Sequence, residues 1–213
     1  SVVLEAKKIG LQNFYLLSMA KIMPPIIQAL LQNSENKIDG FLCPGHVSTV
    51  IGTKPYYFIP RQYQIPCVIA GFEPVDILFA IYRLIAQKVE QKPAVENQYR
   101  RAVREEGNPI ALKKMNEVFS AVGSEWRGIG KVANSGLELK SEFSVMNARN
   151  IAVKIEKTLE NSGCRCGEVL RGVITPLHCP LFKKECTPEN PIGACMVSSE
   201  GTCAAYFKYS IES

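Results

Sequence analysis

The sequence predicts an α/β protein with a small, mostly parallel, doubly wound sheet that is flanked by helices and followed by an irregular region rich in cysteine. Three observations support this fold class. Over about the first 120 residues, short apolar runs alternate with helical patterns, in the order that βαβ units produce. These runs are largely apolar, as strands covered on both faces are. Six of the eight cysteines fall within about the last fifty residues.

The expected elements of the first half follow in chain order. VVLEAKK (2–8) has helical character, and FYLLSM (14–19) is expected to be a strand. PPIIQALLQ (24–32) opens with prolines that suit a first helical turn. IDGFLC (38–43) is a second strand, HVSTVIG (46–52) a short helix or turn, and PCVIAG (66–71) a third strand. Apolar residues at helical spacing predict the clearest helix of the chain over about 74–91.

The second half is less regular. The polar segment AVENQY (94–99) is expected to be a solvated loop, and another helix is predicted over about 108–122. GIGKVANSGLELKSEF (128–143) indicates irregular structure with one or two strands, and 144–160 is expected to be helical or extended. These elements suggest an α/β (Rossmann-like) domain at 1–122, a connecting segment at 123–162 that belongs partly to a domain outside this sequence, and a Cys-rich region at 163–213.

Composition excludes several classes of protein. A chain of 213 residues with 46% hydrophobic residues is long enough to bury a core. The net charge of +5 is scattered, so no nucleic-acid-binding stripe is expected. No apolar run approaches the ~18 residues of a membrane span, and no signal peptide is visible, so we expect a soluble, cytoplasmic protein without a membrane partner. The start at Ser1 without Met suggests a fragment of a longer protein.

Two loops that follow predicted strands carry the residues of a candidate site. Cys43, Pro44, Gly45 and His46 form CPGH, and Gly71 to Pro74 form GFEP. Because ligands bind beyond the carboxyl ends of parallel strands, His46 and Glu73 are expected at one edge if their strands are neighbours. They would supply a proton carrier and a base, beside helix N-termini that suit a small anion. Cys43 would be either a reactive thiol or a buried core residue.

The tail cysteines Cys179, Cys186, Cys195 and Cys203 follow one another at intervals of 7, 9 and 8 residues. Zinc sites usually bring their ligands in pairs two to four residues apart, which these intervals do not provide. A cubane cluster takes one thiolate at each iron, so ligands on separate loops can surround it. The spacing therefore favours an iron-sulfur cluster, with zinc, disulfides and free thiols as open alternatives.

Cys164 and Cys166 form a Cys-Arg-Cys pair just before the tail. Two thiols separated by one residue suit metal binding. They also suit a dithiol/disulfide couple, whose thiolate form the neighbouring Arg165 would favour. The sequence leaves both roles, metal binding and redox chemistry, open for Cys164 and Cys166.

The sequence resembles the HypD family of hydrogenase maturation proteins. The segments that carry the resemblance are KIDGFLCPGHVSTVIGTKPY, IPCVIAGFEPVDIL, VENQYRRAVREEGNP, EWRGIG, CRCGEVLRG and CPLFKKECTPENPIGACMVSSEGTCAAY. They span nearly the whole chain. The resemblance implies a cytoplasmic iron-sulfur protein that helps to build the Fe(CN)2CO unit of [NiFe] hydrogenases together with HypC, with cyanide supplied through HypE.

The resemblance also implies residue roles. Cys179, Cys186, Cys195 and Cys203 look like the ligands of a [4Fe-4S] cluster. The family's cluster neighbourhood is similar to that of ferredoxin:thioredoxin reductase, so Cys164 and Cys166 would be redox thiols beside it. The CPGH and GFEP loops match cleft motifs of the family, where transient iron with cyanide and carbon monoxide would be handled. Cys43, His46 and Glu73 would act on these ligands, and Pro44, Gly45 and Gly71 would hold them.

The sequence departs from the family in one respect. Family members carry N-terminal motifs similar to Cys-Gly-Gly-His and Gly-Pro-Gly-Cys-Pro-Val-Cys, where iron is thought to be held, and neither occurs here. A complete activity is therefore not expected from this chain alone. The alternatives to a maturation scaffold are a thiol-disulfide oxidoreductase and a zinc-stapled interaction module.

Overall fold

A computed structural model describes residues 1–153 and 161–210. Its centre is a three-stranded parallel sheet of β1 (Phe41–Pro44), β2 (Cys67–Ala70) and β3 (Val95–Asn97), in that order. Cys43 lies opposite Ile69, and Ile69 opposite Asn97. The predicted strands 38–43 and 66–71 are therefore confirmed, and the sheet is parallel as predicted.

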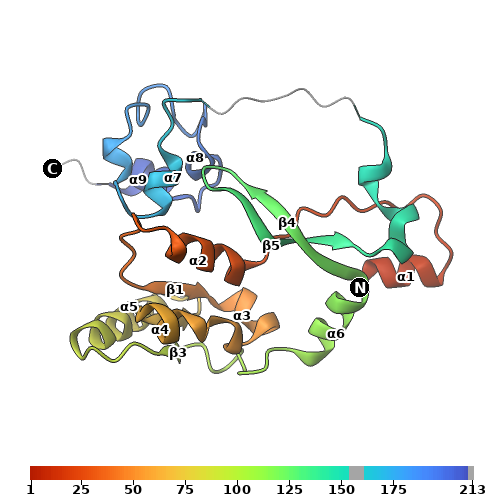
Figure 1. The fold of residues 1–213 in the computed structure, drawn as a ribbon, viewed down its shortest axis with the longest axis horizontal. Coiled ribbons are helices and arrows are strands. Elements are labelled where there is room, and N and C mark those ends of the chain that lie inside the picture. Colours follow the sequence, from red (N-terminus) through yellow and green to blue (C-terminus); the bar gives the residue numbers. More distant parts are fainter. Residues whose placement is uncertain (154–160, 211–213) are drawn as a thin grey trace.

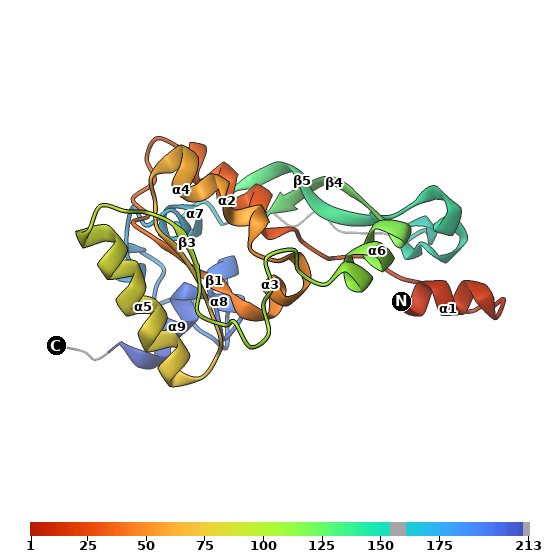
Figure 2. The same ribbon diagram turned by 90° about the horizontal axis from the view of Figure 1, so that it is seen from below.

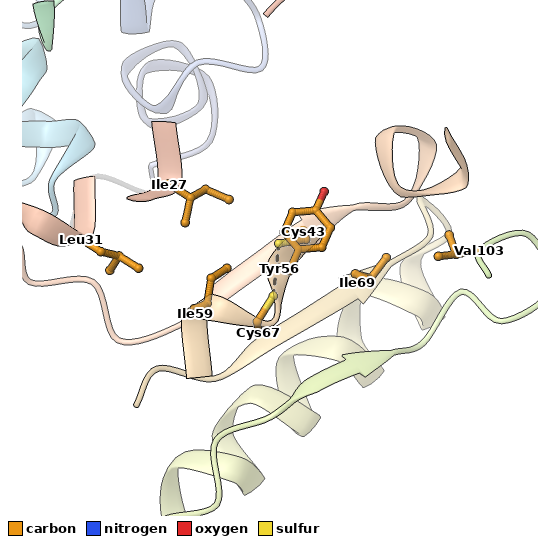
Figure 3. Packing of buried hydrophobic residues seen from close by; sticks show 8 residues of the cluster. All are labelled: Ile27, Leu31, Cys43, Tyr56, Ile59, Cys67, Ile69 and Val103. Atoms are coloured by element: carbon orange, nitrogen blue, oxygen red, sulfur yellow. Dashed lines mark hydrogen bonds between the residues drawn. The ribbon is translucent and has the colours of Figure 1, made fainter. Parts of the chain in front are cut away.

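Helices cover both faces of this sheet. On one face, Cys43, Cys67 and Ile69 pack against Tyr56 and Ile59 and against Ile27 and Leu31 (Figure 3). These partners come from the 3-10 turn η1 (Lys54–Tyr56), from α4 (Phe58–Tyr63) and from α2 (Met23–Gln32). On the other face, Val68 and Ala70 pack against Ala80 of α5 (Pro74–Val89). The alternation of β2 side chains between the two clusters follows from the twofold period of a strand.

The helices begin where the sequence provides starting signals. Proline stands in the first turn of α2 and of α5, where its missing N–H costs nothing. The helix α3 (Gly45–Ile51) follows β1 directly and ends at Gly52, whose φ of 78° favours glycine. In α6 (Pro109–Val118), the Asn108 side chain accepts hydrogen bonds from the amides of Ile110 and Ala111 at 3.0 Å, an N-terminal cap.

The strands β4 (Phe119–Trp126) and β5 (Gly130–Leu139) form a separate antiparallel hairpin outside this layered unit. It runs from the side of α1 (Val2–Lys8) and α6 to the Cys-rich region (Figure 1). At its base, Val3 and Ala6 pack with Val118, Leu139 and Phe143, the last from η2 (Ser141–Met146). Figure 2 shows that α1 and α5 lie at opposite ends of the molecule.

Three expectations for this part of the chain are wrong. The helix predicted to reach residue 122 ends at Val118, because the chain then enters the ladder of β4. The segment 14–19 is not a strand but makes only an isolated bridge, Leu16 with Asn147. The polar segment 94–99 is not a solvated loop, since Val95–Asn97 pair with β2. Of the range 144–160, the described part forms the end of η2 and the 3-10 turn η3 (Ala148–Asn150), and 154–160 lies outside the described residues.

The Cys-rich region consists of short helices joined by turns. They are α7 (Cys166–Leu170), η4 (Pro176–His178), α8 (Ala194–Val197) and α9 (Thr202–Tyr209). Its buried cluster contains Cys166, Cys186, Cys195 and Cys203 together with Phe182 and Met196. Cysteines thus make up half of the buried residues that hold this region together, in place of a larger apolar core. In the part of the chain that the structure describes, no helix is long and apolar enough to cross a membrane.

Candidate functional site

The CPGH and GFEP loops meet at the carboxyl edge of the parallel sheet. Because β1 and β2 are parallel neighbours, His46 and Glu73 lie at the same edge, as expected if their strands paired. The His46 ring stacks at a tilt on Phe72, with ring centroids 5.2 Å apart. Both rings are exposed, and so is Glu73. The edge therefore presents an imidazole and a carboxylate to solvent.

The two glycines at this edge permit close packing around Tyr99. A Cβ added at Gly45 would lie 2.5 Å from the Ala70 carbonyl oxygen and 2.6 Å from the Tyr99 ring. A Cβ added at Gly71 would lie 2.9 Å from the same ring and would overlap the Asp76 carboxylate. These glycines therefore let the two loops approach Tyr99, and their role in holding a ligand stays a prediction.

Arg101 adds a cation to the edge. Its guanidinium donates two hydrogen bonds to the Asp76 carboxylate, at 3.0 and 2.5 Å, and lies 3.5 Å from a carboxylate oxygen of Glu73. It also lies over the Tyr99 ring, 4.5 Å from the centroid. The hydrogen bonds from Arg101 lower the pKa of Asp76, and those to Asp76 raise the pKa of Arg101.

Sequence reasoning missed Asp76, Tyr99 and Arg101. Asp76 could have been noticed as an acidic residue in the first turn of a helix, where the helix dipole favours it. The pairing of Arg101 with α5 depends on the chain turning back after β3, and no local pattern indicates that turn. Together with His46 and Glu73, these residues form an edge that can orient a small polar ligand and exchange a proton with it.

Cys43 lies away from this exposed edge. Its side chain is 2% exposed, and its Sγ is 3.4 Å from Sγ of Cys67, which is fully buried (Figure 3). The hydrogen bond with the Cys43 thiol, together with burial, raises the pKa of Cys67 far above its usual range, so this thiol stays protonated. The geometry corresponds to the core alternative for Cys43.

The six cysteines of the Cys-rich region line one cavity. They share it with the apolar side chains of Val169, Leu181, Phe182 and Met196. The space open to the centre of a water molecule is about 10 Å³, within about 300 Å³ that atoms do not fill. The six thiols are Cys164, Cys166, Cys179, Cys186, Cys195 and Cys203, and all are free of disulfides.

Within this cavity, Cys166 and Cys195 are in direct contact, with their Sγ atoms 2.6 Å apart. The hydrogen bond from Cys195 lowers the pKa of Cys166 to about 7, and it raises that of Cys195. Nearby Arg127 adds to the lowering at Cys166. Cys195 also interacts with Cys203, and Cys164 interacts with Cys166, Cys179 and Cys186. Cys166 and Cys195 are thus a close pair within a set of six thiols that share one cavity.

The donor set fits an iron-sulfur cluster. Sulfur is the donor that such clusters take from proteins, and the remaining wall of the cavity is apolar. Among the described residues, no three His, Cys, Asp or Glu side chains are arranged to share a single metal ion. A cubane binds each thiolate at a different iron, so its ligands stand further apart than those of one ion. The sulfur atoms would have to move outward to receive it.

Comparison with known proteins gives a consistent result. The family described as HypD, hydrogenase formation hypA family, matches residues 1–210. The chain is 45% identical over 215 residues to the hydrogenase expression/formation protein HupD of Azotobacter chroococcum, covering 98% of this chain and 57% of that protein. It is 43% identical over 215 residues to the hydrogenase maturation factor HypD of Azotobacter vinelandii, with the same coverage. For the hydrogenase maturation factor HypD of Escherichia coli, identity is 42% over 207 residues, or 96% of this chain and 56% of that protein. The chain therefore spans just over half the length of these relatives.

Proposed function

Because the chain belongs to the HypD family of hydrogenase formation proteins, we propose that it supplies two sites of a cytoplasmic maturation factor for [NiFe] hydrogenases. One is the sheet edge around His46 and Glu73, and the other is the thiol-lined cavity. The factor would work with HypC and with the cyanide donor HypE while the Fe(CN)2CO unit is assembled. Transient iron with cyanide and carbon monoxide is its cargo.

The observation that carries the proposal is the convergence of six thiols on one cavity in a chain of this family. When bound, a [4Fe-4S] cluster supplies single electrons to neighbouring thiols. The protein's part is to enclose the sulfurs in an apolar shell and to keep one dithiol, Cys166 with Cys195, in contact. Such a dithiol can store two electrons as two thiols and release them as a disulfide.

Two sets of cluster ligands are consistent with the cavity. The first is the set Cys179, Cys186, Cys195 and Cys203 that the family resemblance implies. In the second, Cys164 replaces Cys195, because Cys195 is in direct contact with Cys166 and Cys164 lines the same cavity as the other three ligands. The second set leaves Cys166 and Cys195 free as the redox pair.

Cys164→Ala and Cys195→Ala distinguish these sets when both variants are purified without oxygen. The variant that removes a ligand loses most of its iron and its absorption near 400 nm, whereas the other keeps about four irons per chain. Cys43→Ala is a matched control, since Cys43 lies in the sheet core. Stoichiometric zinc, or iron content that neither substitution changes, would contradict a cluster in this cavity.

At the sheet edge, His46 would carry a proton to or from a small diatomic ligand, and Glu73 with Arg101 would orient it. The paired charges of Arg101, Asp76 and Glu73 fix the position of the guanidinium in front of the Tyr99 ring. Such an edge suits cyanide for two reasons. A cation attracts the cyanide anion, and a proton carrier can convert the anion to hydrogen cyanide and back.

The edge assignment is tested in a full-length relative, at the positions aligned with His46 and Glu73. Alanine at both positions should abolish hydrogenase maturation in a host that lacks its own HypD, while the iron content of the factor stays unchanged. Alanine at the position aligned with exposed Glu90 serves as the control. Normal maturation by the double variant would remove His46 and Glu73 from the proposal.

A thiol-disulfide oxidoreductase is the second candidate, and the 2.6 Å contact of Cys166 with Cys195 favours it. In that case the metal-free protein should show a reversible two-electron couple, and Cys166→Ser alone should eliminate it. Iron would then be dispensable. A couple that appears only in iron-loaded protein would favour the cluster-bearing maturation factor.

A further inference from the structure

A pocket of about 590 Å³ lies where the turn of the β4–β5 hairpin meets the Cys-rich region. The hairpin contributes residues 125–130, and the Cys-rich region contributes Cys164 to Glu168 with Ile192 to Ala194. The two parts are in close contact, since Gly128 packs directly on Gly167 and Arg127 donates to the Ile192 carbonyl oxygen at 3.1 Å. Figure 1 shows the hairpin tip beside α7 and α8. The volume is that of a site for a small molecule.

Three guanidinium groups, those of Arg127, Arg165 and Arg171, line this pocket and outnumber its two carboxylates, those of Glu125 and Glu168. Arg165 is paired with Glu168. Arg127 has no carboxylate within ion-pair distance among the described residues. Arg171 pairs with exposed Glu35, at 3.5 Å through Nη2, and its charge also acts on Glu168, while its buried Nε has no hydrogen-bond partner within the described part of the chain. The buried Nε–H of Arg171 lacks an acceptor, which is costly, and exposed Arg127 has no carboxylate partner, so both guanidinium groups favour an anionic ligand here.

The inner wall of the pocket is made of thiols. Cys164, Cys166 and Gly193 line both this pocket and the thiol-lined cavity behind it. Gly193 has no side chain to close the passage, because a Cβ there would lie 2.5 Å from Sγ of Cys164 and 4.0 Å from Sγ of Cys166. A molecule held by the two arginines would therefore lie beside the side chains of both Cys164 and Cys166.

From these observations we infer that the pocket binds a low-molecular-weight thiol that carries a carboxylate, sulfonate or phosphate group, and that this thiol reduces the Cys166–Cys195 pair. Arg127 and Arg171 hold the anionic group, and the ligand's sulfur reaches Cys166 past Gly193. The inference rests on the proposed function, in which these thiols are oxidised as they deliver electrons.

The step is a thiol-disulfide exchange in two stages. The ligand's thiolate attacks Sγ of Cys166 in the oxidised pair; a mixed disulfide forms, the Cys166–Cys195 bond breaks, and Cys195 leaves as a thiolate that takes up a proton. A second ligand thiolate then attacks the ligand's sulfur in the mixed disulfide and releases Cys166, which is protonated in turn. Two ligand thiols are oxidised to one disulfide, and two electrons reduce the protein pair to the dithiol.

The test compares two thiols of similar size, 2-mercaptoethanesulfonate and the neutral 2-mercaptoethanol. The purified chain is oxidised, the linked Cys166–Cys195 peptide is identified by mass, and its reduction is followed with each thiol. The ratio of the two rates is then compared between the wild type, Arg127→Gln, Arg171→Gln and the control Arg61→Gln. Arg61 is an exposed guanidinium outside the pocket. Using a ratio cancels the different intrinsic reactivity of the two thiols.

The expected result is that each pocket variant lowers the ratio by about tenfold while the rate with 2-mercaptoethanol and the Arg61→Gln ratio stay unchanged. Tenfold corresponds to the loss of one hydrogen bond to a charged group. An unchanged ratio in both pocket variants would overturn the inference. Because the Arg127 side chain is exposed, we expect Arg127→Gln to keep the local fold.

A second measurement needs no disulfide. Trp126 is the chain's single tryptophan and lines the pocket, so its fluorescence should respond saturably to ethanesulfonate in the wild type and not in Arg171→Gln. The same weak, non-saturating response in both proteins would also overturn the inference. Iron content distinguishes a failure of this inference from a failure of the proposed function. Protein that binds iron but shows no preference for the anionic thiol refutes only this inference. Protein that never binds iron refutes the proposed cluster.

Discussion

Replacing Glu96 tests whether the polar strand β3 is held by a partly buried ion pair. Its carboxylate accepts hydrogen bonds from Nε and Nη2 of Arg83, at 2.8 and 3.0 Å, and from Nε2 of Gln87 at 2.6 Å. Gln87 is 3% exposed, and its own carbonyl oxygen accepts from the amide of Ala94 at 2.8 Å. This network fastens β3 to α5, so Glu96→Gln should loosen both.

The magnitude follows from the exposure of the pair. The side chains of Arg83 and Glu96 are 31% and 23% exposed, so solvent screens their attraction only in part. A hydrogen bond to a charged group contributes ~1.5–3 kcal/mol, and glutamine keeps one acceptor for Arg83. We expect Glu96→Gln to lower the free energy of unfolding by about 2 kcal/mol. The control Asp39→Asn breaks the ion pair of Asp39 with Lys88, whose side chains are 83% and 62% exposed. This change should lower the free energy of unfolding by less than about 0.5 kcal/mol.

Urea unfolding followed by circular dichroism measures both changes, provided that the slope m is equal in all proteins. The pH gives a second check. Arg83 lowers the pKa of Glu96, so the stabilisation is fully present above the pKa of the unfolded chain and is lost as pH falls through the lower folded pKa. The difference between wild type and Glu96→Gln should therefore vanish in acid. Equal costs for Glu96→Gln and Asp39→Asn at neutral pH would refute this account of β3.

Three further predictions concern packing and the thiol site. Leu78 on α5 is 67% exposed, so Leu78→Lys should change the free energy of unfolding by less than about 0.5 kcal/mol in urea. Ala80 is fully buried on the same helix, so Ala80→Leu should lower it by about 1–3 kcal/mol. Gly45→Ala forces its methyl group onto the Tyr99 ring and should cost about 1–3 kcal/mol in the same assay, with the emission of Tyr99 altered. Removal of iron by a strong chelator should accelerate amide hydrogen exchange in residues 161–210 and leave β1 to β3 unchanged; uniform acceleration would contradict a cluster confined to the Cys-rich region.

The layered part of the fold was predictable because its signals are local. Apolar strands followed by helices with proline in the first turn predicted β1, β2, α2 and α5, and the parallel pairing placed His46 and Glu73 at one edge. The errors arise where tertiary contacts decide. The apolar run 14–19 is extended, as its composition suggests, but its backbone finds only scattered partners such as the carbonyl of Met146. A strand needs a neighbour as much as it needs a propensity.

The polar strand and the arginines could not be predicted for a related reason. Glu96 and Asn97 have low strand propensity, and only the pairing with β2 and the hydrogen bonds of Glu96 to α5 make them part of a sheet. Arg101 meets Asp76 across 25 positions of sequence, and Arg127 meets Ile192 across 65. Spacing in the sequence identified the thiols, but it gave no indication that Cys195 contacts Cys166.

The thiols of Cys43 and Cys67 lie at the centre of the parallel sheet, where no reagent can reach them while the sheet is closed. Each alkylation of these two residues therefore records an opening event of the sheet. Under conditions where closing is faster than the chemical reaction, the slowing of their labelling relative to a free peptide thiol gives the equilibrium constant for opening. Cys43 and Cys67 are thus built-in probes of the stability of the sheet that positions His46 and Glu73. Their labelling is independent of the chemistry at the six tail cysteines.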